Sequence, residues 1–177
     1  MRAWLNNLLP SLESFGLWGY WVVGFLVFGE ALVLTSVFVP GTAVVVLAGA
    51  LAAQGVYDFG DMIWFVATGT IVGAQASFRI GSGGEYLFRK DRRILSVSNL
   101  DRGRWFFARY GPVSIVTGHF LGPLRPIVPV VAGMSGMSRH QFLLWNLIGG
   151  LSYSIILLGV GYFFGNVLGL TESNMTQ

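Results

Sequence analysis

Two long apolar stretches limit what this chain can fold into. Residues 141–170 carry no charged side chain, and residues 15–39 carry a single one, Glu30. At about 1.5 Å of rise per helical residue, each stretch can cross the roughly 30 Å hydrocarbon core of a bilayer. Only 11% of the 177 residues are charged, whereas soluble domains contain about 25%. We therefore expect an integral membrane protein and exclude a soluble enzyme.

A break follows the first apolar stretch. Pro40 and Gly41 interrupt the sequence there, and the uncharged segment that follows them ends near residue 57. Because lipid offers no hydrogen-bond partners to irregular backbone, such a segment must turn back as a re-entrant hairpin or lie among other helices. We expect a hairpin at residues 40–57 and a second spanning helix at residues 62–78.

A second broken region covers residues 112–138. A straight helix would not tolerate its prolines and glycines, so we expect another hairpin, shaped by Gly118, Gly122, Pro123, Pro126 and Pro129. Interruptions at corresponding places in two halves are typical of inverted-repeat transporters. The sequence predicts an all-α single membrane domain over residues 1–177, with halves at 15–80 and 111–170.

A polar segment, residues 81–110, separates the two halves. Seven of the chain's 11 Lys and Arg residues lie in it: Arg89, Lys90, Arg92, Arg93, Arg102, Arg104 and Arg109. The positive-inside rule places this segment in the cytoplasm, where part of it forms an amphipathic helix on the membrane surface. The N-terminus is then expected in the cytoplasm, and Asp58 and the C-terminus outside.

Glu30 and Arg125 are the two charges that cannot easily reach an interface. Each would cost about 2.5–3.5 kcal/mol if it were unpaired at the centre of a spanning helix, so we expect them to be paired or to face water. One interpretation is a buried ion pair that only fixes the packing. The other is a site at the membrane midplane, where Glu30 exchanges protons and Arg125 binds an anion or a phosphate. His119 lies close enough in sequence to Arg125 to join this site.

Other kinds of chemistry have weaker support. The chain has no cysteine and only two histidines, so we expect no metal site and no thiol catalysis. The sequence Gly133-Met134-Ser135-Gly136 matches the motif of intramembrane serine proteases, with His119 or His140 as base. However, short matches arise easily among 25 glycines, and we expect no enzyme, no cofactor and no nucleic-acid partner.

Several of these residues together resemble the DedA family of bacterial membrane proteins, also known as the VTT or SNARE-associated domain group. The resemblance covers nearly the whole chain and is carried by Glu30, Pro40-Gly41, the segment from Gly118 to Pro129, Ala132-Gly133, Phe142, Asn146 and Gly161-Tyr162. It implies two inverted re-entrant hairpins in the bacterial inner membrane. It also implies movement of lipids or lipid phosphates between leaflets, including undecaprenyl phosphate recycling. The family's acidic residue falls on Glu30 and its second arginine on Arg125.

Two departures from the family pattern concern the same site. Thr42 replaces a residue that is often acidic, and His119 replaces the first arginine. Losing an acid and a base together suggests that positions 42 and 119 face each other across a cavity. An imidazole becomes charged only as the pH falls toward about 6.5, so anionic substrate should bind more tightly in acid.

These observations favour a lipid or lipid-phosphate transporter, with membrane lipids as partners and protons as a candidate partner. They are compatible with a homodimer but do not define the oligomeric state. The alternative is a membrane homeostasis or interaction protein that transports nothing and whose buried ion pair is structural.

Overall fold

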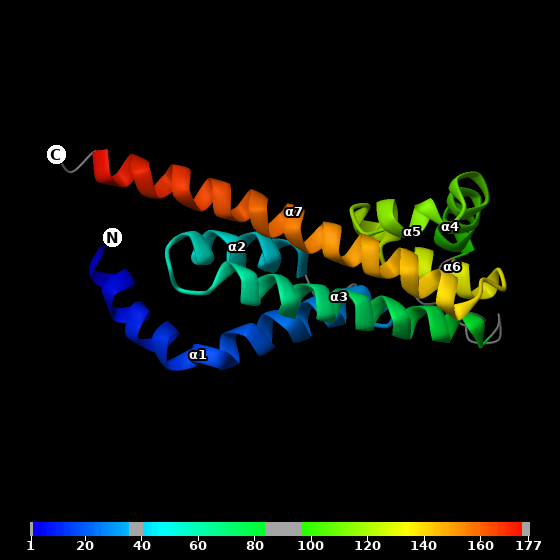
Figure 1. Cartoon of the computed structure of the whole chain (residues 1–177), viewed down its shortest axis with the longest axis horizontal. Helices are drawn as coiled ribbons and strands as arrows, with labels where there is room; N and C mark the ends of the chain where they lie inside the picture. Colours follow the sequence, from blue (N-terminus) through cyan, green and yellow to red (C-terminus); the bar gives the residue numbers. More distant parts are fainter. Residues whose placement is uncertain (1, 36–40, 84–96, 175–177) are drawn as a thin grey trace.

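A computed structural model describes residues 2–35, 41–83 and 97–174, and every regular element in these ranges is helical. The elements are α1 (Arg2–Ala31), α2 (Gly41–Ala53), α3 (Phe59–Ser82), α4 (Val97–Tyr110), α5 (Val113–Gly118), the 3₁₀ turn η2 (Gly122–Leu124), α6 (Ile127–Met134) and α7 (Arg139–Asn174). The predicted all-α class is confirmed. The helices form an elongated bundle along which α3 and α7 run, with both termini at one end (Figure 1).

One described helix is both long and apolar enough to cross a membrane: residues Arg139–Val167 of α7, with a mean hydropathy of 1.8 over its most apolar part. The shorter apolar helices are Gly16–Ala31 and Gly41–Ala53. α3 has 24 residues, which corresponds to about 36 Å, but it does not reach the same hydropathy. α1 has 30 residues but is interrupted at Gly16, where φ is 33°, so its apolar part is the short arm Gly16–Ala31. The bundle is therefore built from the long helices α3 and α7 and several short arms.

The expected first spanning helix, residues 15–39, is wrong. α1 ends at Ala31, and the backbone N–H of Asp58 donates to the Tyr20 hydroxyl over 2.8 Å. The apolar part of α1 thus starts beside the turn between α2 and α3, so the expectation that the N-terminus and Asp58 lie at opposite ends is also wrong. α1 and α2 are two arms that start and finish at one end of the bundle (Figure 1).

A serine on another helix explains why α1 stops. The Ser77 hydroxyl on α3 donates to the Ala31 carbonyl over 3.0 Å and accepts the Val33 N–H over 2.9 Å. These bonds satisfy backbone groups that the interrupted helix leaves open, and Ser77 is itself fully buried. Pro40, which the sequence indicated as the break, lies outside the described residues.

The region 112–138 is broken as expected, into α5, η2 and α6. Gly118 ends α5, and a Cβ there would lie 3.1 Å from the Val128 side chain, so the two arms pack closely. Pro126 precedes α6 and Pro129 lies in its first turn, where a missing N–H leaves no bond broken. Gly122 and Pro123 form part of η2, and a Cβ on Gly122 would meet nothing within 4 Å.

The short arms pack on the two long helices. α1 and α6 lie against α3, and α2 and α5 lie against α7. Glycines permit the closest approaches, because a Cβ on Gly161 would lie 2.0 Å from the Val46 carbonyl oxygen and one on Gly81 would lie 2.1 Å from that of Val130. Small residues at such crossings are a general feature of helix packing in membranes.

The helix α4 lies against α6. Its Phe107 is half-buried and packs on Ile127 and Val131 of α6, while Arg104 and Arg109 are exposed. The amphipathic helix expected between residues 81 and 110 is thus present, and part of its apolar face contacts α6 in the second broken region.

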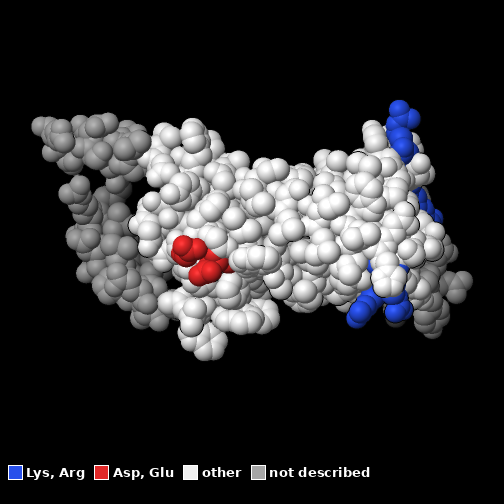
Figure 2. All heavy atoms as spheres, viewed as in Figure 1, with Lys and Arg blue, Asp and Glu red and all other residues white. Residues whose placement is uncertain are grey.

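Charges divide between the two ends of the bundle. Figure 2 shows the acidic side chains toward the end where the termini lie and the basic ones at the other end. Among the described residues, the exposed acidic side chains are Asp58 and Asp61, and the exposed basic ones are Arg79, Arg104, Arg109 and Arg139.

We predict that Gly161→Ala destabilises the protein by about 1–3 kcal/mol, because the new methyl group would overlap the backbone of α2. Gly159→Ala is the matched control on the same helix, since a Cβ there would meet nothing within 4 Å. Thermal unfolding in detergent should show a lower Tm for the first variant only. Equal Tm values would contradict the close contact between α2 and α7.

We predict that Ser77→Ala costs about 1–3 kcal/mol, because it leaves buried backbone groups of α1 without partners. Ser154→Ala provides the control. Ser154 is also fully buried, but its hydroxyl donates to the Gly150 carbonyl of its own helix. A loss no larger for Ser77→Ala than for Ser154→Ala would show that Ser77 does not stabilise the end of α1.

Candidate functional site

A buried ion pair joins the two halves of the chain. Glu30 lies in the last turn of α1, and Arg125 lies between η2 and α6. The Nη1 atom of Arg125 donates to Oε2 of Glu30, and the two side chains are 1% and 15% exposed, respectively. The two isolated charges of the apolar sequence are thus paired with each other. Each of them lies at the break in the helices of its own half.

The start of α2 holds the other oxygen of Glu30. Both the backbone N–H and the hydroxyl of Thr42 donate to Oε1, over 3.0 and 2.7 Å. A Cβ on Gly41 would lie 2.6 Å from Oε2, so a glycine is needed for the carboxylate to sit this close. The N-terminus of a helix attracts negative charge, so the start of α2 is a suitable partner for this carboxylate.

Two further side chains hold the guanidinium of Arg125. Its Nη1 donates to the Tyr153 hydroxyl over 2.7 Å, and its Nη2 donates to the Thr70 hydroxyl over 3.1 Å. Its Cζ also lies 4.0 Å from the centroid of the Tyr153 ring, which is a favourable cation–π geometry. The Tyr153 hydroxyl in turn donates to Thr42 over 3.3 Å, so Tyr153 bridges the two halves of the site.

His119 lies on the other side of Tyr153, with ring centroids 6.3 Å apart. Its Nε2 is 3.2 Å from Oδ1 of Asn146, whose amide donates to the Ile71 carbonyl. Because Oδ1 can only accept, Nε2 carries the proton. Nδ1 is then a bare acceptor, buried and without a hydrogen-bond partner among the described residues.

Thr42 and His119 do not contact each other directly through any interaction seen in the described residues. Both approach Tyr153 instead. The two positions at which the chain departs from the family pattern therefore lie around one tyrosine.

Four residues of this region were given no role from the sequence: Thr70 and Ser77 on α3, and Asn146 and Tyr153 on α7, of which Asn146 was named only for the family resemblance. Each pair is seven residues apart, which places its members on one helix face two turns from each other. All four are fully or almost fully buried. Polar side chains at this spacing within apolar helices were the signal that could have identified them.

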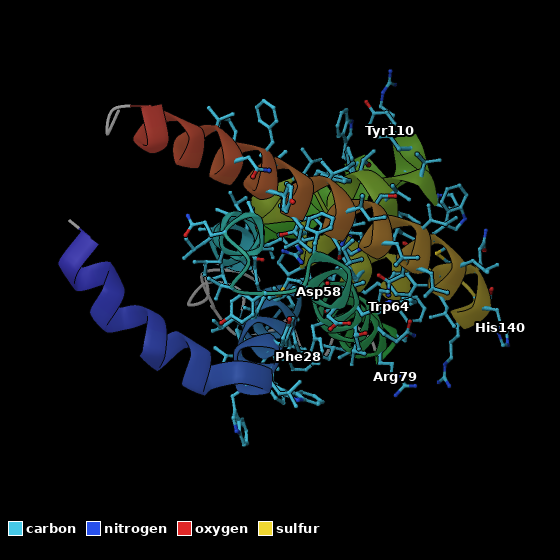
Figure 3. All side chains as sticks on the ribbon, turned by 60° about the vertical axis from the view of Figure 1, so that its left-hand side comes forward. Phe28, Asp58, Trp64, Arg79, Tyr110 and His140 are labelled. Carbon is cyan, nitrogen blue, oxygen red and sulfur yellow. The ribbon has the colours of Figure 1, made fainter. Side chains whose placement is uncertain are left out.

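The protease motif receives no support from the described contacts. The Ser135 hydroxyl donates to the Val131 carbonyl over 2.8 Å. His140 is exposed near the start of α7 and points away from the bundle, as Arg79 does (Figure 3). Among the described residues, no group of three or more His, Cys, Asp or Glu side chains could hold a metal ion.

The arrangement is suited to binding an anion. A guanidinium matches the geometry of phosphate and carboxylate oxygens, and here a carboxylate of the protein itself occupies that position. Thr42 is exposed whereas Arg125 is buried, so the site opens on the Thr42 side.

Comparison with known proteins agrees with the resemblance described from the sequence. The sequence matches the VTT domain over residues 39–170. Protein DedA of Escherichia coli K12 is 31% identical over 165 residues, which is 91% of this chain and 75% of that protein. Inner membrane protein YghB of the same strain is 30% identical over 81% of this chain and 66% of its own length. Inner membrane protein YqjA is 27% identical over 82% and 67%. No solved structure matches. The chain belongs to the DedA family of VTT-domain membrane proteins.

Proposed function

We propose that this protein moves lipid phosphates between the leaflets of the bacterial inner membrane, with undecaprenyl phosphate as a candidate substrate. In this proposal Arg125 binds the phosphate, and Glu30 occupies Arg125 when no lipid is bound. The observation that carries the proposal is the Glu30–Arg125 ion pair, which is buried, joins the two broken regions and can be reached beside Thr42.

The two carboxylate oxygens suggest how substrate and proton could be coupled. A lipid phosphate that enters beside Thr42 must displace Oε2 of Glu30 from Arg125. In this proposal the displaced carboxylate of Glu30 is the group that exchanges a proton. Proton release would then return Glu30 to Arg125 and expel the lipid.

We also propose that α1–α2 and α5–α6 are two re-entrant hairpins related by an inverted repeat. In each half the first arm packs on the long helix that follows it, α1 on α3 and α5 on α7. The second arm packs on the long helix of the other half, α2 on α7 and α6 on α3. This exchange supports a two-fold relation between the halves, with Glu30 and Arg125 near its axis.

The charge distribution supports an orientation. The end that carries Arg79, Arg104, Arg109 and Arg139 would face the cytoplasm, and the end that carries Asp58 and Asp61 would face outside (Figure 2). Because the two termini lie at the acidic end (Figure 1), both would be outside.

A structural role for the ion pair is the second candidate. Glu30 and Arg125 each have several partners, and a buried pair of this kind can serve only to fix the packing of two hairpins. The protein would then act in membrane homeostasis without transporting a lipid.

We predict that Glu30→Gln and Arg125→Gln each reduce transport at least about tenfold. Arg125→Gln removes the side chain that binds the phosphate, and Glu30→Gln removes the charge that expels the lipid. Liposomes loaded with undecaprenyl phosphate and treated with an external phosphatase would report the transport rate. Arg139→Gln, which changes an exposed charge at the basic end, is the control and should transport normally.

The exchanged pair Glu30→Arg with Arg125→Glu separates the two candidates. It restores a pair of opposite charges but moves the arginine that binds the phosphate from position 125 to position 30. A folded exchanged variant should therefore remain inactive. Recovery of transport in this variant would show that the pair only fixes the packing and that the lipid binds elsewhere, whereas an absence of transport by the wild-type protein would favour the second candidate. Normal transport by either single variant would show that the site is elsewhere.

We predict that an epitope tag at the N-terminus and a cysteine at Asp58 are both accessible from outside, and a cysteine at Arg109 only from the cytoplasm. The chain has no cysteine of its own, so impermeant thiol reagents give an unambiguous result. Labelling of positions 58 and 109 from the same side would contradict this topology.

A further inference from the structure

We propose that a groove between α1 and α3 binds a membrane phospholipid whose headgroup carries a positively charged nitrogen. The two helices lie side by side (Figure 1), and the groove between them has a volume of about 390 Å³. Its lining is almost entirely apolar, and an acidic residue, Asp61, lies at one end of it. The proposal does not depend on whether Arg125 transports a lipid, because the groove lies on the other side of α1 and α3.

Glycines form the floor of the groove, and aromatic side chains form its walls. A Cβ on Gly69 of α3 would lie 2.4 Å from the Gly24 carbonyl oxygen of α1, so the two helices touch along the floor. Phe25 lines the groove from α1, and the rings of Trp21 and Phe65 pack edge to face, with centroids 5.3 Å apart. One turn of a helix, about 10 Å wide and 5.4 Å high, already fills about 420 Å³. The groove therefore fits a hydrocarbon chain and not a partner helix.

The length of the groove matches one leaflet of a bilayer. Asp61 lies one turn before Trp64, and Val72 lines the groove eleven residues further along α3. Eleven helical residues span about 16 Å, and half of the hydrocarbon core is about 15 Å thick. Trp21 and Trp64 are 52% and 68% exposed near the acidic end, where indole rings can contact a chain and donate to headgroup oxygens. The acyl chain of a lipid in that leaflet thus fits the whole groove.

The acidic end defines the headgroup. Positions 61, 65, 68 and 72 are three or four residues apart, so Asp61 lies on the face of α3 that lines the groove. The backbone N–H of Asp61 donates to the Asp58 carboxylate over 2.9 Å, whereas its own exposed carboxylate has no ion pair within the described ranges. Exposed arginines lie at the opposite end (Figure 2). This end therefore repels a purely anionic headgroup and attracts an ammonium group.

The geometry of both helices separates the groove from the Glu30–Arg125 site. Phe28 lines the groove, and Glu30, two residues later, lies about 200° around α1. On α3, Thr68 lines the groove, and Thr70, which accepts from Arg125, is likewise on the opposite side. A lipid in the groove thus does not contact the ion pair. It covers the contact between α1 and α3 and holds the first arm on the long helix.

The purified full-length chain in detergent can be titrated with dioctanoyl phosphatidylethanolamine, and native mass spectrometry reports the bound fraction. Thr68→Phe places a ring in the middle of the groove and should weaken binding at least about tenfold, because the acyl chain loses its apolar contacts. Thr117→Phe is the matched control, since Thr117 is exposed on α5 and does not line the groove; it should bind like wild type. Equal losses in both variants, or no loss in Thr68→Phe, would overturn the proposal.

A comparison of headgroups tests the role of Asp61. Dioctanoyl phosphatidylglycerol has the same chains and a phosphate but no charged nitrogen, so it should bind the wild-type protein about threefold more weakly or worse. Asp61→Asn should bring the two affinities close together. Equal affinity of the wild-type protein for both lipids, or an unchanged difference in Asp61→Asn, would overturn the assigned headgroup.

A second copy of the chain is the other occupant that these spectra detect. A lipid-free dimer that Thr68→Phe dissociates and Thr117→Phe does not would overturn the assignment to a lipid. Arg125→Gln should bind phosphatidylethanolamine like wild type, so this proposal and the transport proposal can fail separately. If Thr68→Phe does not fold, the headgroup comparison with wild type and Asp61→Asn still decides the outcome.

Discussion

The ion pair between Glu30 and Arg125 is the contact on which the rest of the structure depends. Neither charge is tolerated alone in an apolar interior, so the two broken regions must meet where these residues lie. Once they meet, the start of α2 must reach the same carboxylate, and α7 must present Tyr153 to the same guanidinium. One electrostatic requirement thus fixes the position of the two broken regions and of the two long helices.

The two broken regions can meet at this ion pair only if the helices of both halves end there. In the second half, Pro126 and the glycines around it end the arms locally. In the first half, the Ser77 hydroxyl forms hydrogen bonds with the Ala31 carbonyl and the Val33 N–H, so that α1 can end inside the bundle. The two breaks therefore have different causes, a local one in sequence and a tertiary one. Glycines such as Gly161 then allow the arms to lie against the long helices.

This difference explains how much could be predicted from the sequence. The helical class, the break at residues 112–138 and the two isolated charges depend on local signals, and the sequence carries them. The end of α1 depends on a hydrogen bond to a serine 44 residues away, and residues 32–35 are as apolar as those before them, so the first helix was predicted too long. Tyr153 was missed and Asn146 was given no role, because an uncharged polar side chain shows its role only when its partners on other helices are known.

The central claim is that Glu30 occupies the place of a phosphate on Arg125. The most direct measurement is the affinity of a short-chain lipid phosphate, such as farnesyl phosphate, for the purified wild-type protein and for Glu30→Gln. Removing the competing charge should tighten binding about tenfold, and Arg125→Gln should abolish it. Equal or weaker binding by Glu30→Gln would contradict the claim.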